Sequence, residues 1–248
     1  MAIAVEFINF SKQFDTHEAV KPLNFQVPSG CFYALLGPNG AGKTTTLRML
    51  SGILAPDKGD ALIYGHSITR HPEAAKQIMA YVPDEPGLYA RLRPLEYLEF
   101  VAGLWQVPPS RAMPYAQELL ERLGIWDRRG EFIEAFPRGL KQRLALAGAF
   151  IHEPKVMLLD EPLTGIDANF ARLVKDMLRD YVQMGNTVIM TTHIMEMAER
   201  MADRIGIFTN GYLLAEGSLD ELRSQAGPQN HSLEDVFIEL THQAEVDG

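Results

Sequence analysis

The 248-residue sequence contains a single cysteine, Cys31, and has no long apolar run. One cysteine excludes an internal disulfide framework and a cluster of thiolate metal ligands, so Cys31 is interpreted as a small apolar residue leading into a strand. No basic-then-apolar segment opens the chain, and no stretch approaches the roughly 20 apolar residues of a membrane-spanning helix. We therefore expect a cytoplasmic protein that contacts membranes only indirectly, through a partner.

Positive charge is also scarce. The chain has 23 lysines and arginines against 32 aspartates and glutamates, which gives a formal net charge of −9. Proteins that bind duplex nucleic acid need basic surface to neutralise phosphates, so no nucleic-acid partner is expected. A hydrophobic content of 46% with 22% charged residues is typical of a globular protein with a substantial core. The length allows one large domain or two closely associated lobes.

Hydrophobic patterning along the chain predicts strands that alternate with helices. The expected strands cover residues 2–10, 31–37, 61–65, 79–83, 156–160 and 187–193, and a hairpin with an Asn210-Gly211 turn covers 204–217. The expected helices cover residues 44–54, 95–123 with a proline-rich break, 141–151, 171–185 and 194–202. This order predicts an α/β fold with a mostly parallel core sheet and helices on both faces, interrupted by an inserted helical subdomain.

A glycine-rich segment, "GPNGAGKTT", lies between an expected strand and an expected helix. It fits the pattern G-x-x-x-x-G-K-[ST], in which backbone N–H groups of a tight loop cradle phosphates. The helix N-terminus adds its partial positive charge. Lys43 would reach the β- and γ-phosphates, and the Thr44 hydroxyl would coordinate Mg²⁺. The sequence therefore predicts a nucleotide site made by Gly37, Pro38, Asn39, Gly40, Ala41, Gly42, Lys43, Thr44 and Thr45.

Adjacent acids end the apolar strand in "VMLLDEP", residues 156–162. A buried parallel strand would deliver Asp160 to the carboxyl edge of the sheet, where it can hold Mg²⁺ directly or through water. Glu161 points differently and is predicted to polarise the water that attacks the γ-phosphate. His193 ends a second apolar strand, and we predict that it contacts the γ-phosphate; a structural or surface role is the alternative.

Together these motifs resemble those of ATP-binding-cassette (ABC) ATPases. The order of "GPNGAGKTT", "EAFPRGLKQR", "VMLLDEP", "LTGID" and "TTH" is that of the family, and the tail "SLEDVFIEL" resembles that of bacterial ABC-2 type exporter subunits. The resemblance implies a P-loop NTPase fold with an N-terminal antiparallel β region, and ATP with Mg²⁺ as ligands. It also implies a head-to-tail dimer with a second ABC ATPase subunit, identical or different. Docking on separate transmembrane permease subunits, at the cytoplasmic face of the cell membrane, is expected as well.

The resemblance also divides the chain and assigns further residues. It implies a single ABC ATPase domain, with a core in 1–84 and 155–217, a helical subdomain with the signature loop in 85–154, and a C-terminal tail in 218–248. Four positions gain roles through it. Arg138 and Gly139 fall in the signature loop, "FPRGL" at residues 136–140, which completes the ATP site of the other subunit in the family. Asp167 matches the acid that crosses the dimer interface. Phe14 matches an aromatic that stacks on adenine; a core aromatic of an edge strand is the alternative.

Two positions depart from the family pattern. Asp84 stands where the family has glutamine; it is expected to keep a contact with Mg²⁺, although an ionised carboxylate cannot donate a hydrogen bond. Pro137 stands where the family has serine, and it lacks both the hydroxyl and the backbone N–H. Proline is tolerated at the start of a helix, so we expect the shared site to form but to close less tightly. The segment 85–100 would lie near the groove for the permease's coupling helix, or would simply pack its own subdomain.

The resulting prediction is an ATP-hydrolysing subunit of an ABC exporter, which drives transport through separate membrane subunits by ATP-dependent head-to-tail dimerisation. A soluble ABC ATPase acting on ribosomes or nucleic acid is the alternative. Such proteins commonly fuse two cassettes or carry long coiled-coil insertions, and this acidic chain has neither. A small-molecule kinase would have no reason to carry the signature stretch, and the presence of Glu161 and His193 speaks against a purely regulatory nucleotide-binding module.

Overall fold

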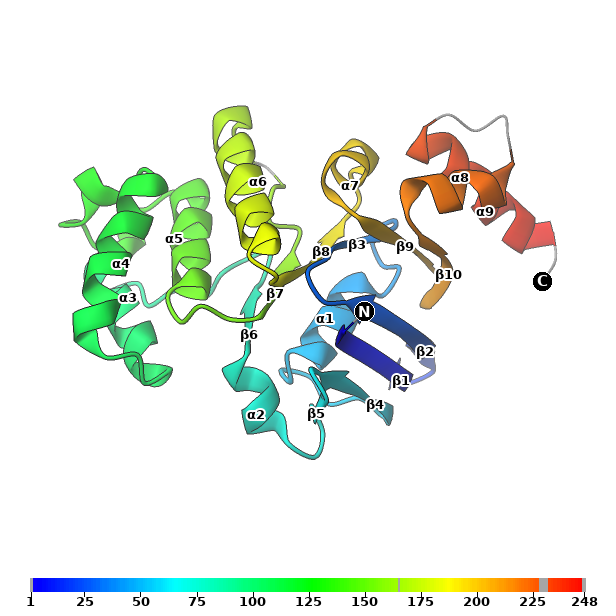
Figure 1. Cartoon of the computed structure of the whole chain (residues 1–248), viewed down its shortest axis with the longest axis horizontal. Coiled ribbons are helices and arrows are strands. Elements are labelled where there is room, and N and C mark those ends of the chain that lie inside the picture. The colour runs from blue at the N-terminus through cyan, green and yellow to red at the C-terminus, as the bar shows by residue number, and fades with distance from the viewer. Residues whose placement is uncertain (1, 165, 228–231, 247–248) are drawn as a thin grey trace.

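Two β-sheets and nine α-helices account for most of residues 2–164, 166–227 and 232–246, the part of the chain that the structure, a computed structural model, describes. The first sheet is antiparallel and has the order β2-β1-β4-β5. Its strands are β1 (Ile3–Phe14), β2 (His17–Pro28), β4 (Lys58–Ile63) and β5 (His66–Ser67). It forms the lower right of the molecule in Figure 1. The predicted N-terminal antiparallel region is therefore confirmed.

The second sheet has the order β10-β9-β3-β8-β7-β6. Its strands are β3 (Phe32–Leu36), β6 (Met79–Val82), β7 (Val156–Asp160), β8 (Thr187–Thr192), β9 (Arg204–Thr209) and β10 (Tyr212–Gly217). All neighbouring pairs are parallel except β9 with β10, which form the predicted hairpin. Asn210 and Gly211 at its turn have positive φ angles of 45° and 82°, as a primed two-residue turn requires. The core sheet is mostly parallel, as predicted.

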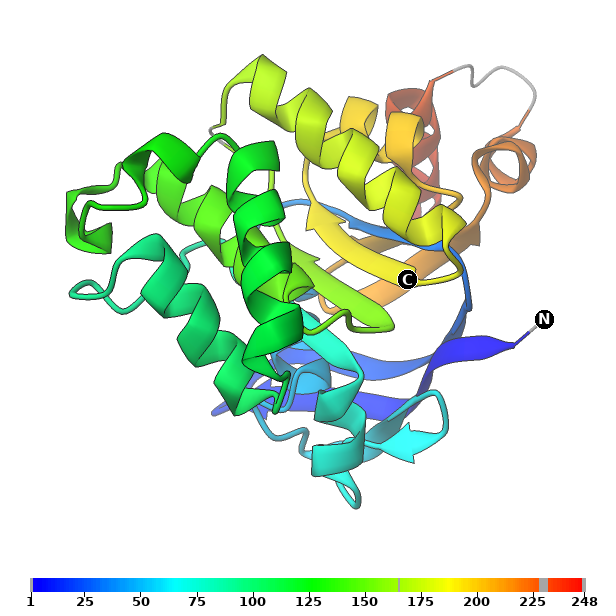
Figure 2. The ribbon, with the colours of Figure 1, turned by 60° about the vertical axis from the view of Figure 1, so that its left-hand side comes forward.

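Helices cover both faces of the large sheet. They are α1 (Lys43–Leu50), α2 (Pro72–Gln77), α3 (Pro94–Leu104), α4 (Pro109–Arg122), α5 (Arg138–Phe150), α6 (Ala168–Gln183), α7 (Met195–Met201), α8 (Leu219–Ala226) and α9 (Leu233–Val246). Figure 2 shows α3, α4 and α5 gathered on one side, with α6 crossing in front of the sheet. The proline-rich break is where α3 ends and α4 begins.

Three groups of buried apolar side chains hold these layers together. One lies between the first sheet, α1 and one face of the large sheet. A second joins α3, α4, α5 and α6 to the opposite face. A third packs α7, α8 and α9 against β3 and β9. Because β3, β7 and β8 are buried along their whole length, the loops at their carboxyl ends are held rigidly at one edge of the sheet.

Candidate nucleotide-binding site

The glycine-rich loop connects β3 to α1, as expected. Gly42 caps α1 with a φ of 101°, and a Cβ atom there would lie 2.4 Å from the carbonyl oxygen of Ala19. Only glycine therefore permits both this backbone angle and this packing. The loop also curls around its own lysine: the Lys43 ammonium donates to the carbonyl oxygens of Gly37 and Pro38, at 2.7 and 2.9 Å. Burial lowers the pKa of Lys43, and the nearby carboxylates oppose that shift.

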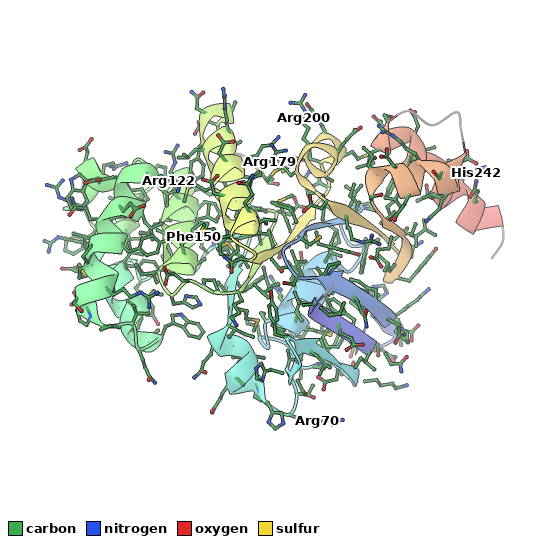
Figure 3. The ribbon with its side chains drawn as sticks, in the orientation of Figure 1. Arg70, Arg122, Phe150, Arg179, Arg200 and His242 are labelled. Carbon is green, nitrogen blue, oxygen red and sulfur yellow. The ribbon has the colours of Figure 1, made fainter. Side chains whose placement is uncertain are left out.

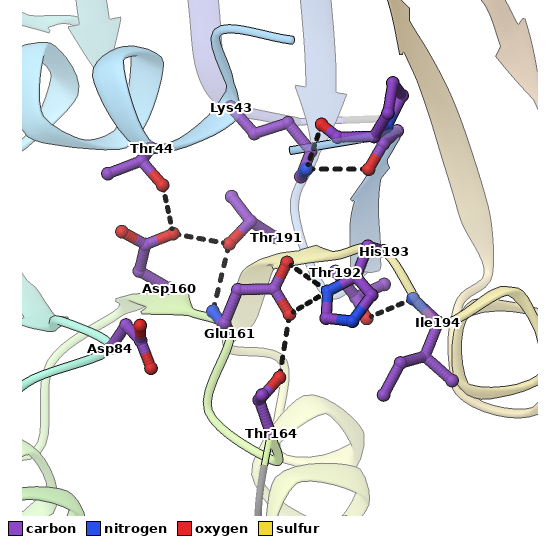
Figure 4. Close-up of polar contacts among 12 residues, drawn as sticks. Lys43, Thr44, Asp84, Asp160, Glu161, Thr164, Thr191, Thr192, His193 and Ile194 are labelled. Atoms are coloured by element: carbon purple, nitrogen blue, oxygen red, sulfur yellow. Dashed lines mark hydrogen bonds and ion pairs between the residues drawn. The ribbon is translucent and has the colours of Figure 1, made fainter. Parts of the chain in front are cut away.

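Asp160 lies at the end of β7, with only 1% of its surface exposed. Its Oδ1 accepts hydrogen bonds from the hydroxyls of Thr44, at 2.9 Å, and Thr191, at 2.6 Å (Figure 4). The Tyr81 hydroxyl donates to its other oxygen at 3.3 Å, and burial together with this carboxylate raises the pKa of Tyr81 to about 12. The structure thus joins the loop threonine to the strand-end acid, as the two motifs predict.

Glu161 turns away from its neighbour and faces the end of β8. It has a positive φ of 47°, and its N–H donates to the Thr191 hydroxyl at 3.0 Å. Its carboxylate lies 3.0 Å from Nδ1 of His193 and accepts a 2.9 Å hydrogen bond from the Thr164 hydroxyl. Figure 4 shows this group beside Asp160 and below Lys43. The two adjacent carboxylates therefore have separate partners, one the threonine of the loop and one the histidine.

A cavity of about 620 Å³ opens between the glycine-rich loop and these acids. Eight predicted residues of the loop and the strand-end acid pair line it: Asn39, Gly40, Gly42, Lys43, Thr44, Thr45, Asp160 and Glu161. Phe14 and Asp84 also contribute to the lining. Gly37, Pro38, Ala41, Arg138, Gly139, Asp167 and His193 are not part of it. Its size suits a small-molecule ligand.

Phe14 is not a core aromatic, so that alternative interpretation is wrong. Its side chain is 46% exposed at the end of β1, which is an inner strand of its sheet rather than an edge strand. The Lys12 ammonium lies 5.4 Å from the centre of its ring. Phe14 presents its ring to the same cavity as the glycine-rich loop, where stacking on a base is geometrically open to it.

Sequence reasoning missed several residues of this site. Arg48 lies one helical turn after Thr44 and Thr45, so the period of α1 could have placed it on the cavity side. His17 reaches the cavity from β2, and no motif marks it. The Thr191 hydroxyl contacts both Asp160 and the N–H of Glu161. Its place in "TTH", at the end of a strand beside His193, could have predicted a position in the site.

Asp84 does not contact the other expected metal ligands; it pairs with Arg138. The guanidinium and carboxylate are 2.6 Å apart, and their side chains are 58% and 46% exposed. Exposed ion pairs contribute little to stability, about 0–1 kcal/mol. Asp84 is thus connected to the signature loop of the same chain by an ion pair. This ion pair is weak enough for either residue to leave it for another partner.

The signature stretch begins helix α5 in the way its proline predicts. Pro137 is the N-cap, with φ −64° and ψ 160°, and its carbonyl accepts from the N–H groups of Leu140 and Lys141. The N–H groups of Arg138 and Gly139 belong to the first turn, where no intrahelical acceptor exists. They are therefore free of intrahelical acceptors and available to donate hydrogen bonds to an anion.

Asp167 caps helix α6 rather than lining the cavity. Its carboxylate accepts a hydrogen bond from the Phe170 N–H at 2.9 Å and pairs with Arg143 at 3.0 Å. These contacts, the first above all, lower the pKa of Asp167. Gly165 of the same motif lies outside the described residues. Asp167 remains 59% exposed as a side chain, so it is accessible to another molecule.

The donor set of the cavity fits a hard divalent cation held together with phosphates. Thr44 and Asp160 offer neighbouring oxygen ligands, and Mg²⁺ in nucleotide sites is held by one or two such ligands with phosphates and water. Among the described residues, no group of three or more His, Cys, Asp or Glu side chains could hold a metal ion alone. A parallel sheet with this loop, a strand-end acid and the cavity between them define a P-loop NTPase.

The comparisons with known proteins name the family. A sequence model described as "ABC transporter" matches residues 20–164. The chain is 35% identical over 224 residues to the daunorubicin/doxorubicin resistance ATP-binding protein DrrA of Streptomyces peucetius, covering 90% of this chain and 68% of that protein. It is 33% identical to the Nod factor export ATP-binding protein I of Paraburkholderia xenovorans, covering 99% and 84%. The chain belongs to the ABC transporter family; it is an ATP-binding subunit with ATPase activity.

Solved structures agree with this assignment. A structure described as an ATP binding subunit of an ABC transporter superimposes with a TM-score of 0.91 at 30% identity, covering 96% of this chain and 99% of that one. The cbiO1 protein of Clostridium perfringens superimposes with a TM-score of 0.76 at 24% identity, over 90% and 91% of the two chains. The second likeness supports the fold alone.

Proposed function

We propose that this chain drives export by hydrolysing ATP while it is docked on a separate transmembrane permease. The observation that carries the proposal is the pair of carboxylates at the cavity, of which Asp160 holds the Thr44 hydroxyl and Glu161 faces His193. Curated relatives named for drug resistance and for Nod factor export support the direction of transport. Cargo choice would belong to the permease.

In this proposal each residue of the cavity has a separate task. The loop N–H groups and Lys43 would hold the phosphates. Thr44 and Asp160 would hold Mg²⁺, joined by Asp84 once it leaves Arg138, and the ion would supply positive charge where negative charge develops. Glu161 orients and deprotonates the attacking water, and His193 contacts the γ-phosphate. Because Glu161 accepts from Thr164 and faces His193 in this structure, it must exchange those contacts for the water before it acts.

We place a second ABC ATPase subunit against the signature loop. Arg138 and Asp167 are exposed and do not line the cavity of their own chain, which is the arrangement expected of residues that complete a partner's site. The first-turn N–H groups of α5 would face the partner's γ-phosphate. ATP binding would close this dimer, and hydrolysis would reopen it. Identical and different partners both fit the described residues.

The permease would dock at a groove of about 500 Å³ beside β6. Pro86, Leu88, Tyr97, Val101 and Trp105 contribute apolar and aromatic lining. Among the described residues, no helix is long and apolar enough to span a membrane. The proposal therefore assigns membrane contact to the permease, with this subunit at the cytoplasmic face. The boundaries of the helical subdomain at 85 and 154 remain a prediction.

Glu161→Gln purified from membranes with ATP and Mg²⁺ tests the proposal. The variant should bind ATP, lose turnover by about two or more orders of magnitude, and retain a multi-span partner. The matched control is Glu153→Gln, a carboxamide substitution outside the cavity. Co-purification of ribosomes or nucleic acid instead of a membrane protein would contradict the transport assignment, and near-normal turnover of Glu161→Gln would contradict the role of Glu161.

A further inference from the structure

A second cavity, of about 640 Å³, lies between α6 and α7. None of the nine residues of the glycine-rich loop contributes to it. Its apolar lining includes Leu163, Ile194 and Met197. The two helices meet across it, because the Arg179 guanidinium donates to the carbonyl oxygen of Arg200 at 2.7 Å. Figure 3 labels both arginines, on α6 and α7 respectively. We call this cavity the α6–α7 groove.

Basic side chains dominate the α6–α7 groove, although the whole chain has a net charge of −9. Its lining has four cations and two carboxylates: Arg172, Lys175, Arg179 and Arg200 against Asp176 and Glu196. Arg200 pairs with Glu196 at 2.8 Å, and both side chains are exposed. Among the described residues, no other ion pair involves these six side chains. The groove therefore keeps an excess of positive charge that the protein does not neutralise.

Burial and the excess of positive charge disfavour the protonated form of Lys175. Its side chain is half-buried in the groove, and burial lowers its pKa, followed by repulsion from Arg179 and Arg200. Asp176 and Glu196 oppose that shift without cancelling it. Like charges held together at a partly desolvated position are unfavourable unless an anion compensates them.

We infer that the α6–α7 groove binds a small, soluble, multivalent phosphate compound. Arginine presents its donors in a planar fork that matches phosphate oxygens, and Lys175 adds a point charge to the same lining. The volume lies in the range of small-molecule sites, and the apolar lining would accommodate an organic group attached to the phosphates. A soluble anion is favoured over a lipid headgroup, because the groove is bounded by residues of both α6 and α7 and its volume suits a compact molecule.

The groove is adjacent along the chain to the expected ATPase residues. Leu163 follows Glu161 by two positions, and Ile194 directly follows His193, so both walls of the groove continue segments of the nucleotide site. The inference does not rest on export or on a permease, since it concerns a cavity of the isolated chain.

Calorimetric titration with pyrophosphate tests the inference. The full chain is first saturated with ADP, so that the glycine-rich loop is occupied. The Mg²⁺ concentration is fixed, so that the same fraction of pyrophosphate is bound to Mg²⁺ in every titration. Salt is kept near 0.15 M, because lower ionic strength exaggerates attraction to surface charges. We expect one further site, and Lys175→Gln/Arg179→Gln should weaken it by at least about tenfold, because two charge-assisted contacts are lost.

The matched control is Lys58→Ala/Arg70→Ala, which removes the same charge from exposed positions outside the groove. It should leave the affinity within about twofold, and circular dichroism should show both double variants folded. Equal affinity in all three proteins, or absence of a second site in the wild type, would overturn the inference. Binding to vesicles of phosphatidate and phosphatidylcholine without binding to pyrophosphate would overturn the choice of a soluble ligand.

Discussion

Pro137 makes a prediction about the dimer site proposed above. The helix α5 starts correctly at this proline, but no hydroxyl is available for a neighbouring phosphate. A hydrogen bond to a charged group contributes about 1.5–3 kcal/mol, so Pro137→Ser should strengthen ATP-dependent dimerisation roughly tenfold or more. Sedimentation and turnover assays would measure the change. Pro137→Ala is the control, since it removes the ring without adding a hydroxyl; if serine performs no better than alanine, the missing hydroxyl is unimportant.

His152 is a second residue whose surroundings make a prediction. Its ring stacks on Trp105 with centroids 4.3 Å apart, Nε2 lies 3.2 Å from the Met79 carbonyl oxygen, and Nδ1 is buried without a partner among the described residues. Burial lowers the pKa of His152 below its ordinary value of 6.5, although the Met79 contact opposes this. As pH falls, His152 is therefore protonated at a higher pH in the unfolded chain than in the folded protein.

The free energy of unfolding should consequently decrease as pH falls below about 6.5, down to the lowered pKa of the folded state. Urea unfolding of the wild type and His152→Phe at about pH 5.5 and about pH 7.5 would measure it, with His242→Gln, an exposed histidine of α9, as the control. His152→Phe should show the smaller pH dependence. An unchanged pH dependence would mean that this histidine titrates alike in both states.

Helices α5 and α6 are joined by Arg143, and this contact makes a prediction at the level of elements. The guanidinium pairs with Asp167, donates to the Leu123 carbonyl oxygen at 3.1 Å, and lies 4.1 Å from the Phe170 ring centre. Arg143→Met should lower the free energy of unfolding by about 1–3 kcal/mol, because the buried carbonyl loses its donor as well. Chemical denaturation would measure it.

Arg122→Met is the matched control, because Arg122 makes a single exposed ion pair with Asp180 of α6. It should cost less than about 1 kcal/mol. Equal losses for the two variants would show that the additional contacts of Arg143 contribute nothing.

Elements with strong periodicity were predictable, whereas those defined by tertiary contacts were not. Buried apolar runs gave β3, β7 and β8, and the 3.6-residue period gave α5 and α6. Strand β2 was missed because Pro22 and polar residues interrupt its alternation, and register shifts with β1 break the regular pattern. Its pairing with β1 is established by long-range contacts that a local pattern does not contain.

The same division holds for the candidate site. The loop, Asp160, Glu161 and His193 were found because each belongs to a motif that ends a strand or begins a helix. His17 was missed because it comes from the other sheet, where only the packing of the two sheets brings it to the cavity. The pairing of Asp84 with Arg138 could not be predicted either, since the two residues are 54 positions apart.

For the whole molecule, nucleotide binding should stabilise the fold. At a ligand concentration about 100 times the dissociation constant, the gain is about 2.7 kcal/mol, which corresponds to a rise of roughly 5–10 °C in Tm. Differential scanning with ADP and Mg²⁺ would measure it. In Thr44→Val the Mg²⁺-dependent part should disappear, while the shift with ADP and a chelator should match that of the wild type. An undiminished Mg²⁺ effect in the variant would exclude Thr44 as a metal ligand.

The turn of the β9–β10 hairpin has a practical consequence. The N–H of Gly211 donates to the Ala41 carbonyl oxygen at 3.1 Å, and the Gly211 carbonyl accepts from Lys21. Next to the turn, a Cβ atom at Gly37 would lie 2.2 Å from the Phe208 carbonyl oxygen. A surface hairpin tip is ordinarily a safe place to insert an epitope tag or a fluorescent reporter. Here an insertion between Asn210 and Gly211 would dislodge the phosphate loop, so labels belong elsewhere on this subunit.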